Sequence, residues 1–300
     1  MGLLALFWGS SFLWIKLALV SFSPMQITLV RAALGATVLI ALCYGMGHRL
    51  PRGRRVWGHL AVAALFGNAV PFALFAFGEQ TVDSGVAGVL NSTTPLWALL
   101  LGILLGAERD LRPVRVAGLV VGFAGTLLIF APWESGELTS WGALAMLVAA
   151  LCYAISFNYI ARYLSGRGTA PIVLSAAQIT AATGLTALAM PVGGLTPVQL
   201  QWSAVIAVAI LGVFGTGFSF VLNYRLIADE GPTNAATVGY LLPVVSVLLG
   251  ALALDEDLNP RVVAGMVVVL VGVAMTRIQR RVPAPVPTPA TTTTAVRSRV

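Results

Sequence analysis

Long runs of apolar residues, separated by short polar or charged connections, make up most of this 300-residue chain. Only 10% of the residues are charged and 58% are hydrophobic, whereas soluble domains carry about 25% charged residues. So few charges cannot cover the surface of a water-soluble globule. The chain is therefore expected to have lipid as its main solvent, which excludes a soluble enzyme, a disordered protein and a secreted disulfide scaffold.

The apolar runs predict ten membrane-spanning helices, because each is close to the roughly 20 residues that cross a bilayer. The runs are continuous and do not alternate, which argues against the strands of a membrane barrel. The predicted fold is an all-α membrane protein, followed by a disordered, Pro/Thr-rich cytoplasmic tail at 278–300. The predicted spans are residues 2–20, 24–46, 57–78, 84–106, 113–131, 140–163, 171–190, 202–226, 232–254 and 260–276.

Basic residues are distributed unequally among the predicted connections. With the N-terminus inside, 15 of the 18 Lys and Arg residues fall in inner loops or at the C-terminal end; the others are Arg261, in an outer loop, and Lys16 and Arg31, within spans. The positive-inside rule then predicts a multi-pass membrane protein with both termini in the cytoplasm. The basic residues are 17 Arg and one Lys, a bias that favours a bacterial genome, so the expected location is a bacterial inner (plasma) membrane. The net charge of +7 is thereby explained as an orientation signal, and no nucleic-acid partner is expected.

The chain also contains a duplication. Residues 95–125 align with residues 243–272, with Pro95 and Pro243 at matching positions. Each copy holds five predicted spans, an odd number, so the second copy must enter the membrane upside down. The loop after the second span holds four arginines and its counterpart at 191–201 holds none, as an inversion requires. Inverted repeats with a site near the bilayer midplane are typical of secondary transporters.

Several segments resemble the EamA-like family of the drug/metabolite transporter superfamily. WGSSFLWIK near the N-terminus, SPMQITLVRAALGA around Arg31 and GAERDLRP at 106–113 are similar to the first EamA repeat, and WGALAMLVAALCYA and DEDLNPRVVAGMVVVLVGV to the second. The resemblance covers 2–131 and 140–277 as the two repeats. It implies a ten-span monomer or homodimer that moves amino acids, other metabolites or drugs by alternating access around a central cavity, often as export.

Two charges lie within predicted spans, where charged residues are rare and usually functional. Arg31 is a candidate for binding an anionic group such as a carboxylate; alternatively, it fixes helix ends or pairs with Glu79 or Asp83. Lys16, about one turn inside the end of its span, is either a second anion-binding group or a side chain that extends to the interface.

Uncharged polar residues near mid-span are further candidates for a substrate-lined cavity, although hydrogen bonding between helices explains such residues as well. These candidates are Asn68, Asn91, Thr94, Tyr153, Asn158, Asn223 and Tyr240. Among the aromatic residues, Phe72, Phe75, Trp97 and Phe220 could line a cavity, but packed or lipid-facing positions are the commoner outcome. Pro95 and Pro243 are hinge candidates, with simple bending as the alternative.

The eleven carboxylates all lie in predicted loops or at span ends. Because proton-driven carriers commonly use buried Asp or Glu, this placement favours a facilitator or an exchanger. No catalytic constellation, metal site or ATP-binding motif is recognisable within the spans, so neither an enzyme nor a cofactor is expected. The predicted function is secondary transport of a small metabolite, by an exporter or exchanger. A channel or a non-transporting membrane partner is the alternative, which saturable counterflow would distinguish.

Overall fold

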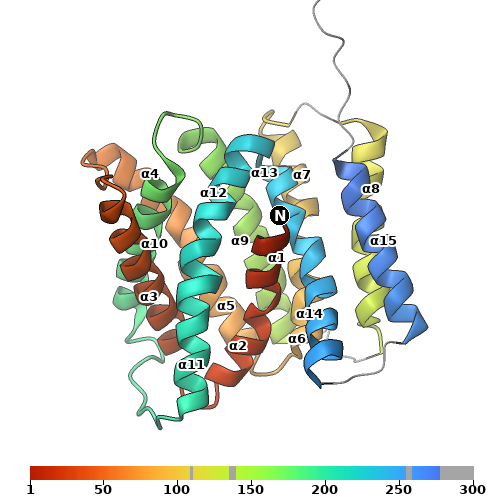
Figure 1. Ribbon diagram of the computed structural model, residues 1–300, viewed down its shortest axis with the longest axis horizontal. Coiled ribbons are helices and arrows are strands. Elements are labelled where there is room, and N and C mark those ends of the chain that lie inside the picture. The colour runs from red at the N-terminus through yellow and green to blue at the C-terminus, as the bar shows by residue number, and fades with distance from the viewer. Residues whose placement is uncertain (109–110, 135–139, 255–258, 278–300) are drawn as a thin grey trace, which may run out of the picture.

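The computed structural model describes residues 1–108, 111–134, 140–254 and 259–277, and every regular element in these ranges is a helix (Figure 1). The acidic connection at 255–258 and the tail at 278–300 lie outside the described residues. The all-helical fold class is therefore confirmed for the described ranges.

Seven helical stretches of this part of the chain are long and apolar enough to cross a membrane. They are α3 (Pro24–Gly45), α4 to α5 (Arg54–Gly78), α6 to α7 (Val86–Leu104), α8 (Pro113–Phe130), α9 (Trp141–Tyr163), α10 (Pro171–Ala189) and α11 to α12 (Trp202–Glu230). The shorter helices are α1 (Gly2–Gly9), α2 (Ser11–Ala18), α13 (Pro232–Ala236), α14 (Val238–Leu254) and α15 (Pro260–Thr276). The protein is thus a multi-pass membrane protein.

Proline begins many of these helices, as the sequence predicts. Pro24, Pro113, Pro171, Pro232 and Pro260 each stand in the first turn of a helix, where the missing N–H would have had no intrahelical partner. At α3 the start is reinforced by a capping box, in which Ser23 and Gln26 exchange hydrogen bonds between side chain and backbone. Local chemistry therefore sets where these helices begin.

Several helices are interrupted near their middle. A π-helical segment, η1 (Leu65–Ala69), separates α4 (Arg54–Ala64) from α5 (Val70–Gly78), and η3 (Leu211–Phe218) separates α11 (Trp202–Ile210) from α12 (Ser219–Glu230). Shorter breaks fall at Ser10, at Ser92–Thr93 and at Thr237. At the second of these, the hydroxyls of Ser92, Thr93 and Thr94 donate to carbonyl oxygens three residues earlier, at 2.6 to 2.7 Å. Side chains thus bind carbonyl groups around this break.

Helices α8 and α15 form a close antiparallel pair through glycines (Figure 1). A Cβ on Gly118 would lie 2.8 Å from the carbonyl oxygen of Gly272, and one on Gly125 would lie 2.9 Å from that of Gly265. The two backbones approach each other as small residues allow in membrane helix packing.

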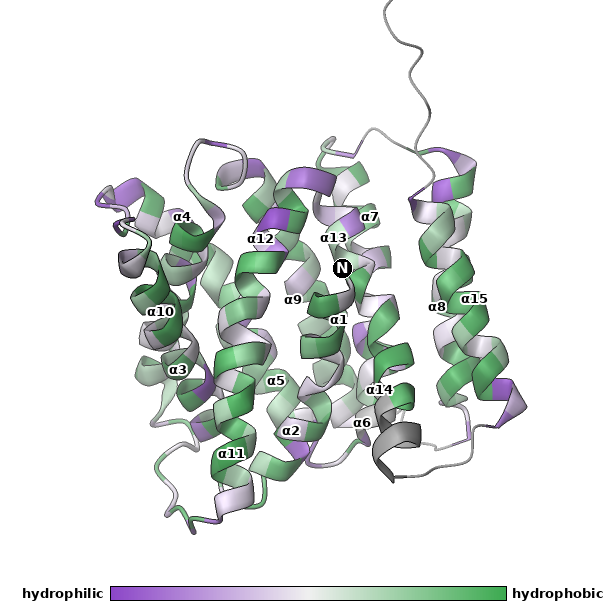
Figure 2. Cartoon of the chain, viewed as in Figure 1, coloured by the Kyte–Doolittle hydropathy of each residue, from purple (hydrophilic) through white to green (hydrophobic). Residues whose placement is uncertain are grey.

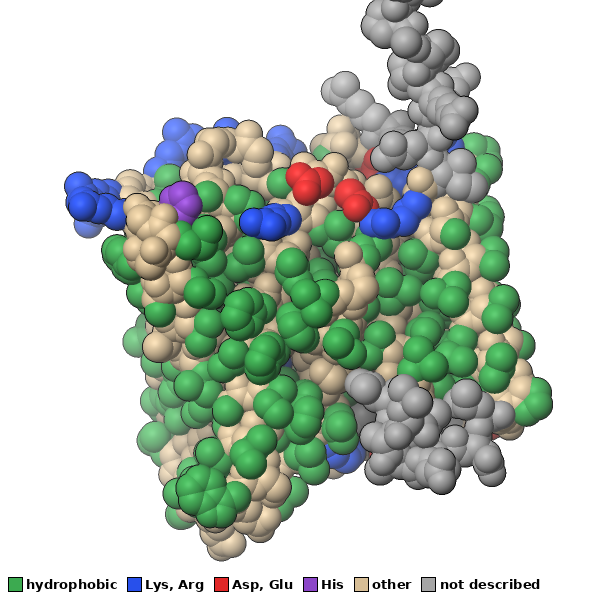
Figure 3. Space-filling view, in the orientation of Figure 1, with side chains coloured by type: hydrophobic (Ala, Val, Ile, Leu, Met, Phe, Trp, Pro, Cys, Tyr) green, Lys and Arg blue, Asp and Glu red, His purple; other side chains and the backbone are tan. Residues whose placement is uncertain are grey.

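The outer surface of the bundle is apolar between two polar edges. Most of the helical ribbon has the colour of hydrophobic residues in Figure 2; in the space-filling view of Figure 3, hydrophobic side chains cover this face and charged side chains gather along its upper edge. Large apolar residues such as Leu188 and Ile206 are exposed. An apolar belt of this extent is the surface that a bilayer covers.

Candidate functional site

A cavity of about 60 Å³ lies inside the bundle, where the interrupted helices meet. This volume is several times the minimum that a cavity needs to hold a water molecule. Aromatic rings form much of its wall, and four polar residues join them. The aromatic members are Trp8, Phe12, Phe72, Phe75, Tyr153, Phe157 and Phe220, and the polar members are Ser11, Arg31, Asn91 and Thr94. Ten different helices, from α1 to α14, contribute to this lining.

Arg31 supplies a positive charge to this aromatic wall. The residue is 5% exposed; its Nε donates to Thr216 Oγ1 at 3.2 Å, and its guanidinium carbon lies 3.7 Å from the centre of the Phe72 ring. It forms no ion pair with a carboxylate of the described residues, so the pairing with Glu79 or Asp83 that the sequence left open is not formed. A buried cation without a carboxylate at ion-pair distance is costly, and an anion in the cavity would compensate its charge.

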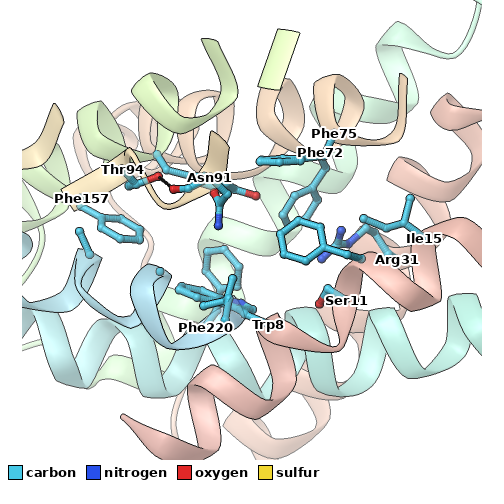
Figure 4. A pocket seen from close by; sticks show the side chains of 15 residues that line it. Trp8, Ser11, Ile15, Arg31, Phe72, Phe75, Asn91, Thr94, Phe157 and Phe220 are labelled. Atoms are coloured by element: carbon cyan, nitrogen blue, oxygen red, sulfur yellow. Dashed lines mark hydrogen bonds between the residues drawn. The ribbon is translucent and has the colours of Figure 1, made fainter. Parts of the chain in front are cut away.

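Asn91 and Thr94 reach the cavity because α6 (Ser84–Asn91) ends there and α7 (Thr94–Leu104) begins there. Thr94 Oγ1 donates to the backbone oxygen of Asn91 at 2.7 Å. The Oδ1 atom of Asn91 is buried and has no hydrogen-bond partner among the described residues. In Figure 4 the Asn91 amide and the Arg31 guanidinium face one space, which the rings of Trp8, Phe72 and Phe220 surround.

Tyr153 is the fourth sequence candidate that lines the cavity. Its ring stacks on Phe75, with 6.0 Å between the ring centres, and lies 6.4 Å from the ring of Phe157. Ring pairs at these distances pack favourably beyond simple burial. Of the aromatic candidates, Phe72, Phe75 and Phe220 also line the cavity.

The other four polar candidates are not among the residues that line this cavity. Asn68 accepts a hydrogen bond of 2.7 Å from Gln178, and Asn158 donates to the backbone oxygens of Ala98 and Ala154. Asn223 and Tyr240 are fully buried, and their side-chain polar atoms have no partner among the described residues. Asn68 and Asn158 therefore form hydrogen bonds between helices in this conformation, which is the alternative to a place in the cavity wall for such residues.

Sequence reasoning missed Trp8, Phe157 and Ser11 as lining residues. Trp8 stacks near Phe157 and meets Phe220 edge-on, with ring centres 6.4 and 6.2 Å apart. One signal was present: Trp8 stands beside the Gly9-Ser10-Ser11 sequence, where the first helical stretch breaks.

Lys16 lies in the last turn of α2 and does not line the cavity. Its ammonium group donates to the backbone oxygens of Glu79 and Val82, at 3.3 and 3.5 Å, and lies 3.7 Å from Asp83 Oδ1. Its side chain is 46% exposed. Lys16 therefore fastens α2 to the turn that follows α5, which agrees with an interfacial role.

A buried ion pair stands near the other edge of the bundle. Arg115 donates to both carboxyl oxygens of Glu108, at 2.8 and 2.9 Å, and Thr233 donates to the same carboxylate at 2.8 Å. The two charged side chains are 7% and 12% exposed. This cluster joins the connection between α7 and α8 to α13, and paired, hydrogen-bonded charges of this kind are costly to disrupt.

Comparison with known proteins identifies the family. The model of the EamA-like transporter family matches residues 1–131 and 140–278. The chain is 29% identical to the "Uncharacterized inner membrane transporter YedA" of Escherichia coli K12, over 82% of this chain and 79% of that protein. It is 27% identical to an "Uncharacterized transporter" of Archaeoglobus fulgidus, over 91% of this chain and 95% of that protein.

Two further matches extend the comparison. The chain is 27% identical to the "WAT1-related protein At3g02690, chloroplastic" of Arabidopsis thaliana, over 89% of this chain and 66% of that protein. A solved crystal structure superposes with a TM-score of 0.75 at 23% identity and covers 92% of this chain and 94% of the other, which shows a shared fold. With its apolar helices and the family match over both of its halves, the chain belongs to the EamA-like transporter family and is a membrane transporter of the drug/metabolite type.

Proposed function

We propose that this protein is a secondary transporter that moves a small metabolite with a carboxylate group across the bacterial inner membrane by alternating access, as an exporter or exchanger. The observation that carries this proposal is Arg31, a buried cation in the wall of an aromatic cavity, with no carboxylate of the described residues at ion-pair distance. In such a place a solute carboxylate is the partner that compensates the desolvated charge.

The cavity also suggests how the rest of the solute is held. Asn91 and Thr94 stand at a helix break, where an amide with an unpartnered oxygen can accept a hydrogen bond from an ammonium or hydroxyl group. Tyr153 and the surrounding rings would pack against an apolar or aromatic side chain. Amino acids and related organic acids combine these groups, so we propose them as the substrate class.

We further propose ten spans in two inverted five-helix repeats, 2–131 and 140–277. The α8–α15 pair supports this arrangement. Gly118 and Gly125 of α8 correspond in the sequence to Gly265 and Gly272 of α15, and Gly118 packs on Gly272 as Gly125 packs on Gly265. Exchanging the two helices reproduces the same contacts, which is what a two-fold axis between antiparallel repeats produces.

The interruptions support the same symmetry. The π-helical segments η1 and η3 fall in the third and eighth predicted spans, and the breaks at Ser92–Thr93 and Thr237 fall in the fourth and ninth. Pro95 stands just after the first of these breaks, and Pro243 lies within α14 after the second. We propose that bending at these paired places opens the cavity alternately to each side, with both termini in the cytoplasm.

A transport assay in proteoliposomes tests the solute site. A panel of amino acids and of hydroxy and oxo acids is screened for saturable flux and for counterflow, which a channel does not support. Arg31→Ala is expected to raise the KM of the transported carboxylate at least tenfold, because a charged hydrogen bond is worth about 1.5 to 3 kcal/mol. Arg49→Ala, in an exposed connection, is the matched control and keeps the wild-type KM.

The result that refutes the site is equally definite. If Arg31→Ala folds, as judged by its elution profile and melting temperature, and transports with an unchanged KM, then Arg31 does not bind the solute. Flux without saturation or counterflow would instead indicate a channel.

A further inference from the structure

Glu79 is a buried carboxylic acid that the proposed solute site does not use. It follows the last residue of α5 (Val70–Gly78) and is 1% exposed. Both carboxyl oxygens are buried, and neither has a hydrogen-bond partner among the described residues. An ionised carboxylate in such surroundings has lost its hydration without a replacement, so the neutral acid is favoured.

The charged groups around Glu79 extend from the cavity wall, at Arg31, to the exposed surface, at Asp83. Lys16 of α2 donates to the backbone oxygen of Glu79 and pairs with Asp83, whose side chain is 79% exposed. Arg31 of α3 lies in the cavity wall, where its charge acts on Glu79 and on Tyr153 of α9. The first turn of α9, packed against the same segment through Gly142, brings no titratable group.

Burial and the neighbouring positive charges act on the pKa of the Glu79 carboxyl in opposite directions. Burial raises the pKa of Glu79 well above its usual range, whereas the positive charges of Lys16 and Arg31 lower this pKa. Burial is the larger influence. Glu79 can therefore exist in either state, and the charge in the cavity helps to decide which.

We propose that Glu79 is a proton-binding site, and that its protonation frees the charge of Arg31 for the carboxylate of the solute. This inference rests on the proposed transport function. Lys16 acts on Glu79 more strongly than Arg31 does, but it also has Asp83 as a counter-ion outside the cavity. In the cavity wall, the charge of Arg31 is balanced either by ionised Glu79 or by a bound solute carboxylate. Both anions together would leave a net negative charge in a low-dielectric site. Uptake of one proton by Glu79 restores neutrality.

The consequence is coupling between proton and solute. Because linkage is reciprocal, a proton on Glu79 strengthens carboxylate binding as much as the carboxylate strengthens proton binding. One proton then accompanies each solute molecule in the same direction, so that export by this cycle runs down the outward gradient of the solute and carries a proton out with it. In the sequence, Glu79 stands at the end of a predicted span, and this placement favours a facilitator or an exchanger. In the structure its side chain is buried, and a buried carboxyl group can couple transport to protons.

Infrared titration of the full-length, reconstituted protein tests the proton site without any solute. We expect the C=O band of a protonated carboxylic acid to titrate with a midpoint above the value of about 4.3 for a free Glu. The band should be lost in Glu79→Gln and kept in Glu134→Gln, the matched control, whose side chain is 59% exposed. A band that survives in Glu79→Gln, or titrates at the ordinary value, overturns the proposal.

Arg31 variants test the link to the cavity. Removal of the charge in Arg31→Gln should raise the midpoint of the Glu79 band by about one pH unit or more, because a nearby cation lowers the pKa of a carboxyl. Arg31→Lys, which keeps the charge, should stay close to the wild-type midpoint. If Arg31→Gln does not fold, the Glu79 band of the wild-type protein is titrated with and without the transported carboxylate. The bound carboxylate is expected to raise the midpoint of this band. An unchanged midpoint in these experiments refutes the link.

Transport provides the functional test. A pH gradient of one unit should drive up to about tenfold accumulation of the carboxylate that the panel identifies, since one proton per solute transmits the whole gradient. Glu79→Gln should keep counterflow and lose this accumulation, and Glu134→Gln should keep both. Wild-type accumulation that ignores the pH gradient overturns the coupling. Absence of flux for every solute, with the Glu79 band intact, refutes the proposed transport and leaves the proton site standing.

Discussion

The contact between α8 and α15 leaves no room for a methyl group at Gly125. A Cβ atom there would lie 2.6 Å from the backbone nitrogen of Val269 and 2.9 Å from the backbone oxygen of Gly265, whereas ordinary Cβ contacts begin at 3.4 Å. Neither backbone atom can rotate away as a side chain can. Gly125→Ala must therefore move the two helices apart by roughly 0.8 Å at this point, in a close-packed interface.

The expected loss of stability follows from two opposing effects. Overpacking of a well-packed interior costs about 1 to 3 kcal/mol, whereas replacing a mid-helix glycine by alanine gains about 0.5 to 1 kcal/mol. The difference between the two effects is a destabilisation of about 0 to 2.5 kcal/mol, and we expect Gly125→Ala to lose about 1 kcal/mol, near the middle of this range. Gly184→Ala is the matched control: a Cβ at this exposed position of α10 would have nothing within 4 Å, so only the helix-propensity gain applies.

Two buried free cysteines, Cys43 and Cys152, make the measurement simple. A dye that fluoresces on reaction with thiols reports their exposure when the purified protein is heated. We expect the midpoint for Gly125→Ala to fall several degrees below wild type, and that for Gly184→Ala to equal or exceed wild type. Equal midpoints for the two alanine variants would show that the α8–α15 interface adjusts freely, and the reasoning from close backbone approach would be refuted.

Three further predictions use the same thermal assay. Because the pKa of Glu79 is raised in the folded state, its contribution to stability is present at low pH and is lost as pH rises through that pKa. The melting temperature of the wild-type protein should therefore fall with rising pH relative to that of Glu79→Gln. Parallel curves of melting temperature against pH for the two proteins would contradict this. Arg115→Met should lower the free energy of unfolding by about 3 to 5 kcal/mol, because it leaves Glu108 without its bidentate cation, and changing Glu108 to Gln as well should restore part of this loss. A melting temperature of Arg115→Met close to that of wild type would rule this out. Tyr224→Phe should cost about 1 to 3 kcal/mol, since it removes the donor to the buried Gln178 side chain, and an unchanged midpoint would show that this bond stabilises little.

Local chemistry made the helix starts and Arg31 predictable from the sequence. Pro24 and Pro113 mark helix starts wherever they stand, because the effect depends on the first turn alone. Arg31 was a candidate because charged residues within spans are rare and usually functional, and the structure places it in the wall of the cavity. Neither inference required knowledge of how the helices pack.

The direction in which a helical side chain points was harder to predict. Asn68 lies in η1, where the backbone departs from regular α-helical geometry. One residue inserted by a π-helical turn rotates the following residues by about 100° relative to a regular helix. Asn68, within this turn, accepts a hydrogen bond from Gln178 and does not line the cavity, although it stands near mid-span as Asn91 does.

Aromatic residues and span-end acids were ambiguous for a different reason. Lipid and an aromatic cavity are both apolar, so composition does not distinguish Trp8, which lines the cavity, from Trp202, which is 83% exposed. Similarly, an acid that follows an apolar run is normally expected at the surface. Glu79 is buried because the turn after α5 packs against α2 and α9, which no local pattern reveals.

The proposed inverted repeats and the proposed coupling place different demands on the two halves of the chain. Alternating access requires two conformations of similar energy, and helices related by a two-fold axis provide them, because each conformation approximates the other turned over. Solute binding has no such requirement. Arg31 and Lys16 have no counterparts in the second repeat, so the charges around the cavity break the symmetry that the helices keep. Changes at Gly125 should therefore alter stability and the rate of exchange between conformations, whereas changes at Arg31 or Glu79 should alter affinity and coupling without slowing counterflow at saturating solute.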